Sequence, residues 1–290
     1  MKKSIGTKIF NAVNFIYLSL LSLAMFIPFV IVLSVSFSSE NAVNKFGYTL
    51  WPHEFSVDAY KLIFESGTVF QAYGVSIFVT VVGTAIAVLI TAMVGYAISR
   101  KYLRYRNVIA LLFYFSMLFS GGLVPWYITV TKLGLKNTIW ALIFPMCFAP
   151  FNMLLIRNFF QTLPDALVES AKLDGAGEMR IFFNIMLPLA LPGLATITLF
   201  YMLGYWNDWW LALNFIDDAE LFPLQYLLRK VLSNVLFAAS GINQQISTGL
   251  IPSETTKMAT CIVTIGPIIF VYPFIQKYFI KGITVGAVKG

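Results

Sequence analysis

Long apolar runs separated by short polar segments dominate this chain. Crossing about 30 Å of hydrocarbon takes ~20 helical residues, and six of the runs reach that length. We place them at residues 14–35, 72–98, 108–131, 138–156, 186–213 and 258–276. None of them shows the short alternating segments of a membrane β-barrel. The pattern therefore predicts an all-α membrane protein with six transmembrane helices.

Several of these runs contain residues that interrupt a helix. The third run includes Gly121, Gly122 and Pro125, and the fifth begins with Pro188 and Pro192. Proline and glycine leave backbone groups that lipid cannot satisfy, so such breaks occur where helices pack on protein or line a wet cavity. The number of these interruptions indicates a helical bundle that transports a solute, and not a passive membrane anchor.

The distribution of lysine and arginine sets the orientation. With the N-terminus inside, the inner segments hold 13 of the 20 basic residues. The segment Arg100–Arg106 weighs most, because it is short and its charges are all basic. We expect both termini inside (N-in/C-in), residues 157–185 in the cytoplasm, and residues 36–71 and 214–257 outside. The basic N-terminus leads into an uncleaved first span.

Composition supports the membrane class. The chain of 290 residues is 59% hydrophobic and 11% charged, whereas a soluble domain carries about 25% charge. The net charge of +7 does not indicate nucleic acid, because the basic residues sit at the ends of apolar runs. Cys147 and Cys261 lie inside apolar runs, which favours buried thiols over a disulfide or a metal site.

We divide the chain into three parts. Residues 1–71 hold the N-terminal tail, the first span and an external loop, residues 72–280 form the transmembrane core, and residues 281–290 form a cytoplasmic tail. The core contains a polar island at residues 164–176, which we expect to be a short helix. Pro164 suits its start, and Gly175 suits a left-handed end.

One face of this expected helix carries small and polar residues at helical spacing. Its members are Leu163, Leu167, Ser170, Ala171 and Asp174. Small residues let another backbone approach closely. From the residues alone, a docking element and an ordinary helix-turn-helix loop both remain open.

The spacing in this region matches a known pattern. Glu169-Ser170-Ala171, three residues, Gly175, nine residues, Ile185, one residue and Leu187-Pro188 resembles the EAA motif of binding-protein-dependent ABC importer permeases. Ser170 replaces the first alanine. The six spans and basic tail resemble the carbohydrate-uptake permeases related to the smaller maltose permease subunit, and the C-terminal part is similar to the alginate and lipoprotein-linked subgroup.

The resemblance implies a type I ABC importer permease fold and a coupling helix seated in a groove of an ATPase. Glu169 would pair near the ATPase surface, Ser170 and Ala171 would pack into the groove, and Gly175 would set the turn. Asp174 belongs to the same implied surface.

The resemblance also implies partners. The chain has no G-x-x-x-x-G-K-[ST] loop, so we expect no cofactor in it and ATP with Mg²⁺ on two separate ATPase subunits. A second homologous permease, an extracytoplasmic solute-binding protein, an oligosaccharide substrate and the lipid of a bacterial cell membrane complete the expected assembly.

Two sets of residues are candidates for contact with substrate and binding protein. The first combines aromatic faces with polar groups, as sugar sites do: Trp126, Tyr127, Tyr201, Tyr205, Trp206, Asn207, Asp208 and Trp209. An outer aromatic belt is the alternative. The second lies in the external loop, which in maltose-type relatives reaches into the binding protein: Gly241, Asn243, Gln244 and Gln245. The tail 282–290 is either an ATPase contact or a frayed end.

An ion-coupled secondary transporter or channel is the alternative function. It would normally place paired charges at mid-membrane depth, and here only Asp208 is available, near one end of its span. The spans show no metal-ligand cluster and no nucleophile beside a base, so we expect neither catalytic residues nor an enzyme.

Overall fold

The computed structural model describes residues 5–65, 67–239, 254–266 and 269, and this part of the chain is helical. One isolated bridge, Ser38 with Phe55, is its only β-pairing. The α-helices are α1 Ile5–Ser36, α2 Glu40–Phe46, α3 Asp58–Glu65, α4 Thr68–Ser99, α5 Arg106–Leu118, α6 Leu123–Lys132, α7 Pro150–Thr162, α8 Asp165–Leu173, α9 Glu178–Ile181, α10 Leu187–Leu189, α11 Leu191–Asn207, α12 Trp210–Phe215 and α13 Leu224–Ala239. Shorter elements are η1 Ile139–Leu142, η2 Phe144–Met146, η3 Phe182–Met186 and η4 Ala219–Leu221.

Two compact units make up the chain. Of the described residues, the first unit contains those up to residue 69 and those from 228 to 266, and the second contains residues 70–227. In the first unit, the Glu40 carboxylate accepts hydrogen bonds from the backbone amides of Glu254 and Thr255, both at 3.1 Å. Those amides open a helix over residues 254–266, so Glu40 caps it across a long sequence distance.

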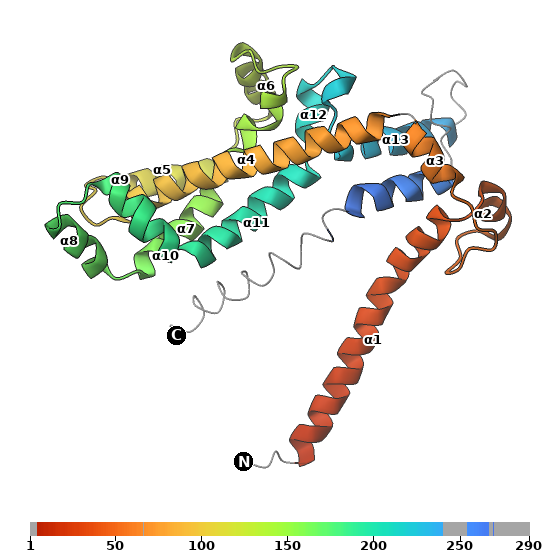
Figure 1. The fold of residues 1–290 in the computed structure, drawn as a ribbon, viewed down its shortest axis with the longest axis horizontal. Coiled ribbons are helices and arrows are strands. Elements are labelled where there is room, and N and C mark those ends of the chain that lie inside the picture. Colours follow the sequence, from red (N-terminus) through yellow and green to blue (C-terminus); the bar gives the residue numbers. More distant parts are fainter. Residues whose placement is uncertain (1–4, 66, 240–253, 267–268, 270–290) are drawn as a thin grey trace. The chain divides into compact units, whose positions relative to one another are not determined.

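The second unit is built around α4, α7 and α11, and α4 runs along it as one uninterrupted helix (Figure 1). Small residues bring these helices together. A Cβ at Gly83 would lie 2.7 Å from the Tyr205 ring, and one at Gly193 would lie 2.8 Å from the Phe159 ring. Membrane helices use glycine in this way because lipid gives no hydrophobic drive and close packing has to supply the attraction.

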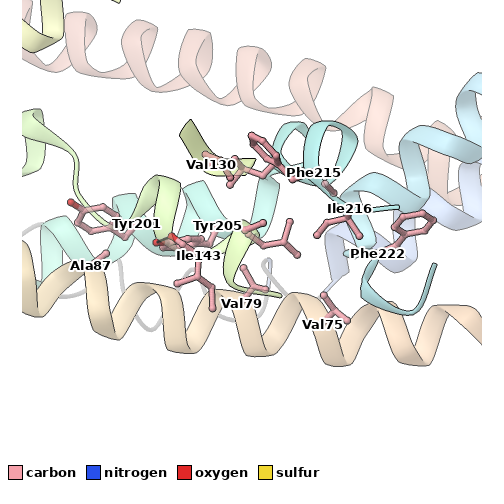
Figure 2. Packing of buried hydrophobic residues seen from close by; sticks show 14 residues of the cluster. Val75, Val79, Ala87, Val130, Ile143, Tyr201, Tyr205, Phe215, Ile216 and Phe222 are labelled. Carbon is pink, nitrogen blue, oxygen red and sulfur yellow. Dashed lines mark hydrogen bonds between the residues drawn. The ribbon is translucent and has the colours of Figure 1, made fainter. Parts of the chain in front are cut away.

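A buried cluster joins α4 to the segments after α5 and α11. Figure 2 shows Val75 and Val79 of α4 on one side of it and Phe215 and Ile216 on the other. The Asn137 side-chain oxygen accepts from the amides of Asp217 and Asp218 at 3.0 and 2.9 Å. These contacts fix the loop after α6 against the end of α12.

Among the residues that the structure describes, two helices, Gly6–Ser36 and Thr68–Ser99, are long and apolar enough to cross a membrane. Three further pairs pass the same test together but bend by 116° between α5 and α6, 50° before α7, and 83° between α10 and α11. The first bend falls at Gly121-Gly122, and the last falls at Ala190, between Pro188 and Pro192, so both lie where the sequence predicted interruptions. The last predicted span is described as helix through residue 266, and its remainder lies outside the described residues apart from residue 269.

The tightest glycine contact gives a test of helix packing. A Cβ at Gly95 would lie 2.6 Å from Ile156 Cγ2 and 3.3 Å from the backbone nitrogen of Arg157, which cannot move cheaply. Gly95→Ala should therefore lower the free energy of unfolding by about 1–3 kcal/mol relative to its control, as overpacking does. Thermal aggregation of the detergent-solubilised protein measures the effect.

Gly74→Ala is the matched control, because it lies on the same helix with no atom within 4 Å of the added Cβ. Both changes share the helix-propensity gain of alanine over glycine. Equal stability of the two variants would contradict the close approach of α4 and α7.

Candidate functional site

The short helix α8 begins and ends where its sequence predicts. Pro164 precedes it, Asp165 lies in its first turn and Lys172 in its last, so both charges complement the helix dipole. Figure 1 shows α8 at the end of the unit where α4 ends and α9 lies. The charge pattern assigns this end to the cytoplasm.

Gly175 ends α8 in a left-handed conformation, with φ of +76°. The amide of Ala176 donates to the carbonyl of Ala171 at 2.9 Å, and the amide of Gly175 donates to the carbonyl of Lys172 at 3.0 Å. This pair of bonds is a Schellman motif, which satisfies two of the carbonyls left free at a helix end. The predicted left-handed glycine turn is confirmed.

The inward face of α8 packs on its own chain. Val168 and Ala171 are buried in a cluster with Tyr96, Phe160 and Phe182. The structure therefore differs from the expectation that Ala171 packs into a partner's groove. A helix this short needs one apolar stripe to attach it, and Ala171 belongs to that stripe.

Charges hold α8 as well. Lys101 Nζ lies 2.6 Å from the Asp165 carboxylate, and Arg100 approaches it at 3.9 Å. The hydrogen bond from Lys101 holds the pKa of Asp165 below its usual value. Exposed pairs of this kind contribute about 1 kcal/mol or less, so they orient α8 more than they stabilise the fold.

The outward face of α8 is exposed. It carries Glu169, Ser170 and Asp174 together with Leu173, whose side chain is 89% exposed. Leu167 is also exposed at 40%. Leu173 is thus an almost fully exposed apolar side chain beside polar residues on the free face, and this combination suits a docking surface.

The second half of the motif forms the irregular entry to α11. After α9 the chain forms a π-helix, η3, then α10 and a bend at Ala190. Pro188 and Pro192 each occupy the start of a helical segment, where a missing amide costs least. Single π-turns inside helices occur frequently at functional sites.

A second candidate site is a cleft of about 670 Å³ where α5 ends and α6 and α12 begin. Trp126, Asp208 and Trp210 line it with the Ser120–Gly122 break. The Asp208 carboxylate accepts from the amide of Leu211 at 3.1 Å, which caps the start of α12. Indole faces and a carboxylate beside a cleft can contact the C–H faces and hydroxyl groups of a sugar.

The structure brings only part of the predicted sugar-contact set to this cleft. Trp126 and Asp208 line it, whereas Tyr127 stacks on Phe215 and the exposed Asn207 donates to the Leu203 carbonyl at 2.9 Å. Trp209 packs edge-on against Trp210.

Tyr201, Tyr205 and Trp206 correct the expectation. All three are buried, and neither tyrosine faces the cleft. The Tyr201 hydroxyl lies 2.6 Å from Thr91 Oγ1, and the Tyr205 hydroxyl donates to the Ile143 carbonyl at 2.9 Å. The two tyrosines join α11 to neighbouring elements, because a buried phenol needs a hydrogen-bond partner.

Reasoning from the sequence missed the residues that hold α8. Lys101, Tyr102 and Glu178 contact this helix. The basic loop was visible, but it entered only as an indicator of orientation. The predicted binding-protein contacts Gly241, Asn243, Gln244 and Gln245, and the tail 282–290, lie outside the described residues.

Residues 104–285 match the family described as "Binding-protein-dependent transport system inner membrane component". Protein LplC of Bacillus subtilis (strain 168) is 42% identical over 284 residues, covering 98% of this chain and 96% of that protein. The polygalacturonan/rhamnogalacturonan transport system permease protein YtcP of the same organism is 40% identical, covering 98% and 99%.

A solved structure is similar over nearly the whole chain. It is described as a bacterial ABC transporter involved in the import of the acidic polysaccharide alginate. The match has a TM-score of 0.82 and 30% sequence identity, and covers 96% of this chain and 99% of that chain.

The turn at Gly175 generates a prediction that is independent of any partner. Gly175→Ala should make the amides of residues 165–176 exchange about 5- to 30-fold faster, because a left-handed alanine costs about 1–2 kcal/mol. Hydrogen-exchange mass spectrometry of the solubilised protein measures this.

Gly177→Ala is the control, since Gly177 has an ordinary φ of −74° and no atom within 4 Å of an added Cβ. Equal exchange in the two variants would show that the positive φ carries no cost.

Proposed function

Because the chain belongs to the family of binding-protein-dependent transport system inner membrane components, we propose that it conducts oligosaccharides into the cell as one permease subunit of an ATP-driven importer. Membership makes it an integral component of the cell membrane and a transport subunit, not an enzyme. The segment Glu169–Pro188 is the EAA motif typical of this family.

The observation that carries the proposal is the geometry of α8. Its inward face is fixed on the chain by Val168 and Ala171, while Glu169, Ser170 and Leu173 are exposed at the end assigned to the cytoplasm. An exposed, rigidly held helix on a subunit without a nucleotide-binding loop suits attachment to a separate motor. This geometry supports the proposal that two separate ATPase subunits bind ATP and Mg²⁺ and drive the bundle between inward- and outward-open states.

The assembly is proposed to include a second homologous permease and an extracytoplasmic solute-binding protein. The six predicted spans are about half the number of transmembrane helices that surround the solute in importers of this class. A second permease is therefore needed to enclose the solute. Ion coupling is not supported, since the family and the relatives are binding-protein-dependent permeases.

The substrate class comes from the relatives. One similar permease is named for polygalacturonan and rhamnogalacturonan, another for arabinooligosaccharides, and the similar structure imports alginate. An oligosaccharide is the chemistry these share. In the cleft where α5 ends and α6 and α12 begin, Trp126 and Trp210 supply stacking faces and Asp208 supplies an acceptor for hydroxyl groups.

Uptake into vesicles tests the function. The purified complex is reconstituted with ATP inside, and its loaded binding protein carries labelled oligogalacturonides, alginate oligosaccharides or arabino-oligosaccharides in separate trials. Uptake of at least one class that stops without ATP is expected. Uptake that continues without ATP and follows a sodium or proton gradient would overturn the proposal.

The exposed face of α8 gives the first variant prediction. Leu173→Ser and Glu169→Lys should each lower ATP-dependent uptake at least tenfold, since both change the surface offered to the ATPase, while the amount of inserted protein stays the same. Co-purification of the ATPase with the permease measures the attachment directly.

Met179→Ser is the matched control for Leu173→Ser, because Met179 is 62% exposed at the same end of the unit but lies on α9. Retention of full uptake and ATPase attachment by both α8 variants would exclude this face as the docking surface.

The cleft gives the second variant prediction. In Asp208→Asn the side-chain oxygen still caps α12, but the negative charge is lost. Transport at saturating loaded binding protein should fall about tenfold, as the loss of one hydrogen bond to a charged group implies. The rate of labelled oligosaccharide release into vesicles is the measurement.

Trp140→Ala serves as a control for aromatic loss outside the cleft, since Trp140 stacks on Phe144. An unchanged rate in Asp208→Asn would assign Asp208 to helix capping alone.

A further inference from the structure

Both ends of α8 contact the cytoplasmic end of α4 or the loop that follows α4. At the first end, Lys101 Nζ lies 2.6 Å from the Asp165 carboxylate. At the other, Lys172 Nζ lies 4.0 Å from the centre of the Tyr102 ring and 2.7 Å from the Glu178 carboxylate. Asp165 and Lys172 are two helical turns apart, so the contacts are spread along α8.

Glu178 completes the second contact. Its Oε2 accepts hydrogen bonds from the Tyr102 hydroxyl at 2.8 Å and from the Tyr96 hydroxyl at 3.2 Å. Lys172 is therefore bound to a carboxylate that two tyrosines of α4 and its loop hold in place.

The apolar face of α8 lies between these two polar contacts. Val168 and Ala171 share a buried cluster with Tyr96. Arg100, only 4% exposed, packs on the Tyr96 ring and donates to the Phe160 carbonyl at 3.2 Å. The α4 end is thus itself anchored to α7. We call residues Tyr96–Tyr102 the α4 grip.

The covalent path from α8 into the membrane is less regular than this contact. It passes through the left-handed turn at Gly175, the π-helix η3 and the 83° bend before α11. Each is a point where the backbone departs from a continuous helix. By contrast, α4 is one helix of 32 residues, about 48 Å long at 1.5 Å per residue.

We propose that the α4 grip receives the movement of α8 and carries it along α4 to the outer side of the membrane. This rests on the proposed function, because it assumes that an ATPase moves α8. It assigns Lys101, Tyr102 and Glu178 as positioning residues for coupling. A rigid helix transmits a displacement of its inner end to its outer end, whereas a chain of turns absorbs part of it.

The ion pair at Asp165 can be broken without unfolding the protein. The Lys101 side chain is 78% exposed and that of Asp165 is 46% exposed, so reversing either charge replaces no buried side chain, and the buried Arg100, 3.9 Å from Asp165, is kept in every variant. Lys101→Glu and Asp165→Lys each place like charges at the contact, and the double variant restores an opposite pair.

Nitroxide labels on α4 test the transmission without a transported sugar. The label is placed at Gly74 or Ile77, which lie on the outer half of α4 and are exposed. The reconstituted complex with its ATPases is compared by electron paramagnetic resonance with and without magnesium ATP and vanadate. Trapped nucleotide per complex is measured in the same samples.

In the unmodified background, trapping should change the spectrum of at least one label. Each single charge reversal should reduce that change at least threefold while trapped nucleotide stays constant, and the double reversal should restore it. Arg104→Glu is the control, because Arg104 lies in the same loop but packs on the Tyr105 ring.

The opposite results are distinct. Three outcomes would overturn the proposal that the α4 grip transmits the movement. They are a full spectral change in the single variants, no spectral change in the unmodified background, and failure of the double reversal to restore the spectral change. Absence of trapped nucleotide in every complex would instead contradict the proposed function.

Discussion

Hydrocarbon offers no partner to a free backbone amide or carbonyl, and this constraint governs where the helices of this chain can break. The bend of 116° between α5 and α6 lies beside the cleft lined by Trp126 and Asp208. The bend of 83° before α11 lies just beyond the coupling segment, where η3 lengthens the hydrogen-bond spacing. Both of these breaks lie next to a candidate site, since a break is allowed only where protein or water covers the backbone.

The helix α8 has a buried face, which attaches it to its own chain, and an exposed face, which is available to a partner. Val168 and Ala171 commit the inner face to the chain, and the pairs at Asp165 and Lys172 fix its direction. The outer face is then free for Glu169, Ser170 and Leu173. A coupling element needs both properties, since a helix that is loose on its own subunit cannot pass on a movement that it receives.

Prediction succeeded where local chemistry decides conformation. A glycine after a short polar helix, followed at fixed spacing by Leu187-Pro188, permits few backbone solutions, and the left-handed turn follows directly. It failed for Tyr201 and Tyr205, whose aromatic character alone fitted a sugar site. Their partners Thr91 and Ile143 are 110 and 62 residues away, so no local pattern could show that the hydroxyls are used within the bundle.

The sequence by itself determined the apolar spans, their orientation, the breaks and the motif that identifies the family, because each depends on hydropathy, charge or short spacing. Only the tertiary structure decided which side of α8 is free and which residues hold it. It also decided which aromatic side chains reach the outer cleft. These features depend on contacts between segments that are far apart in the sequence. Gly83 and Gly95 permit such contacts, because a glycine leaves room for the neighbouring helix to pack closely against α4.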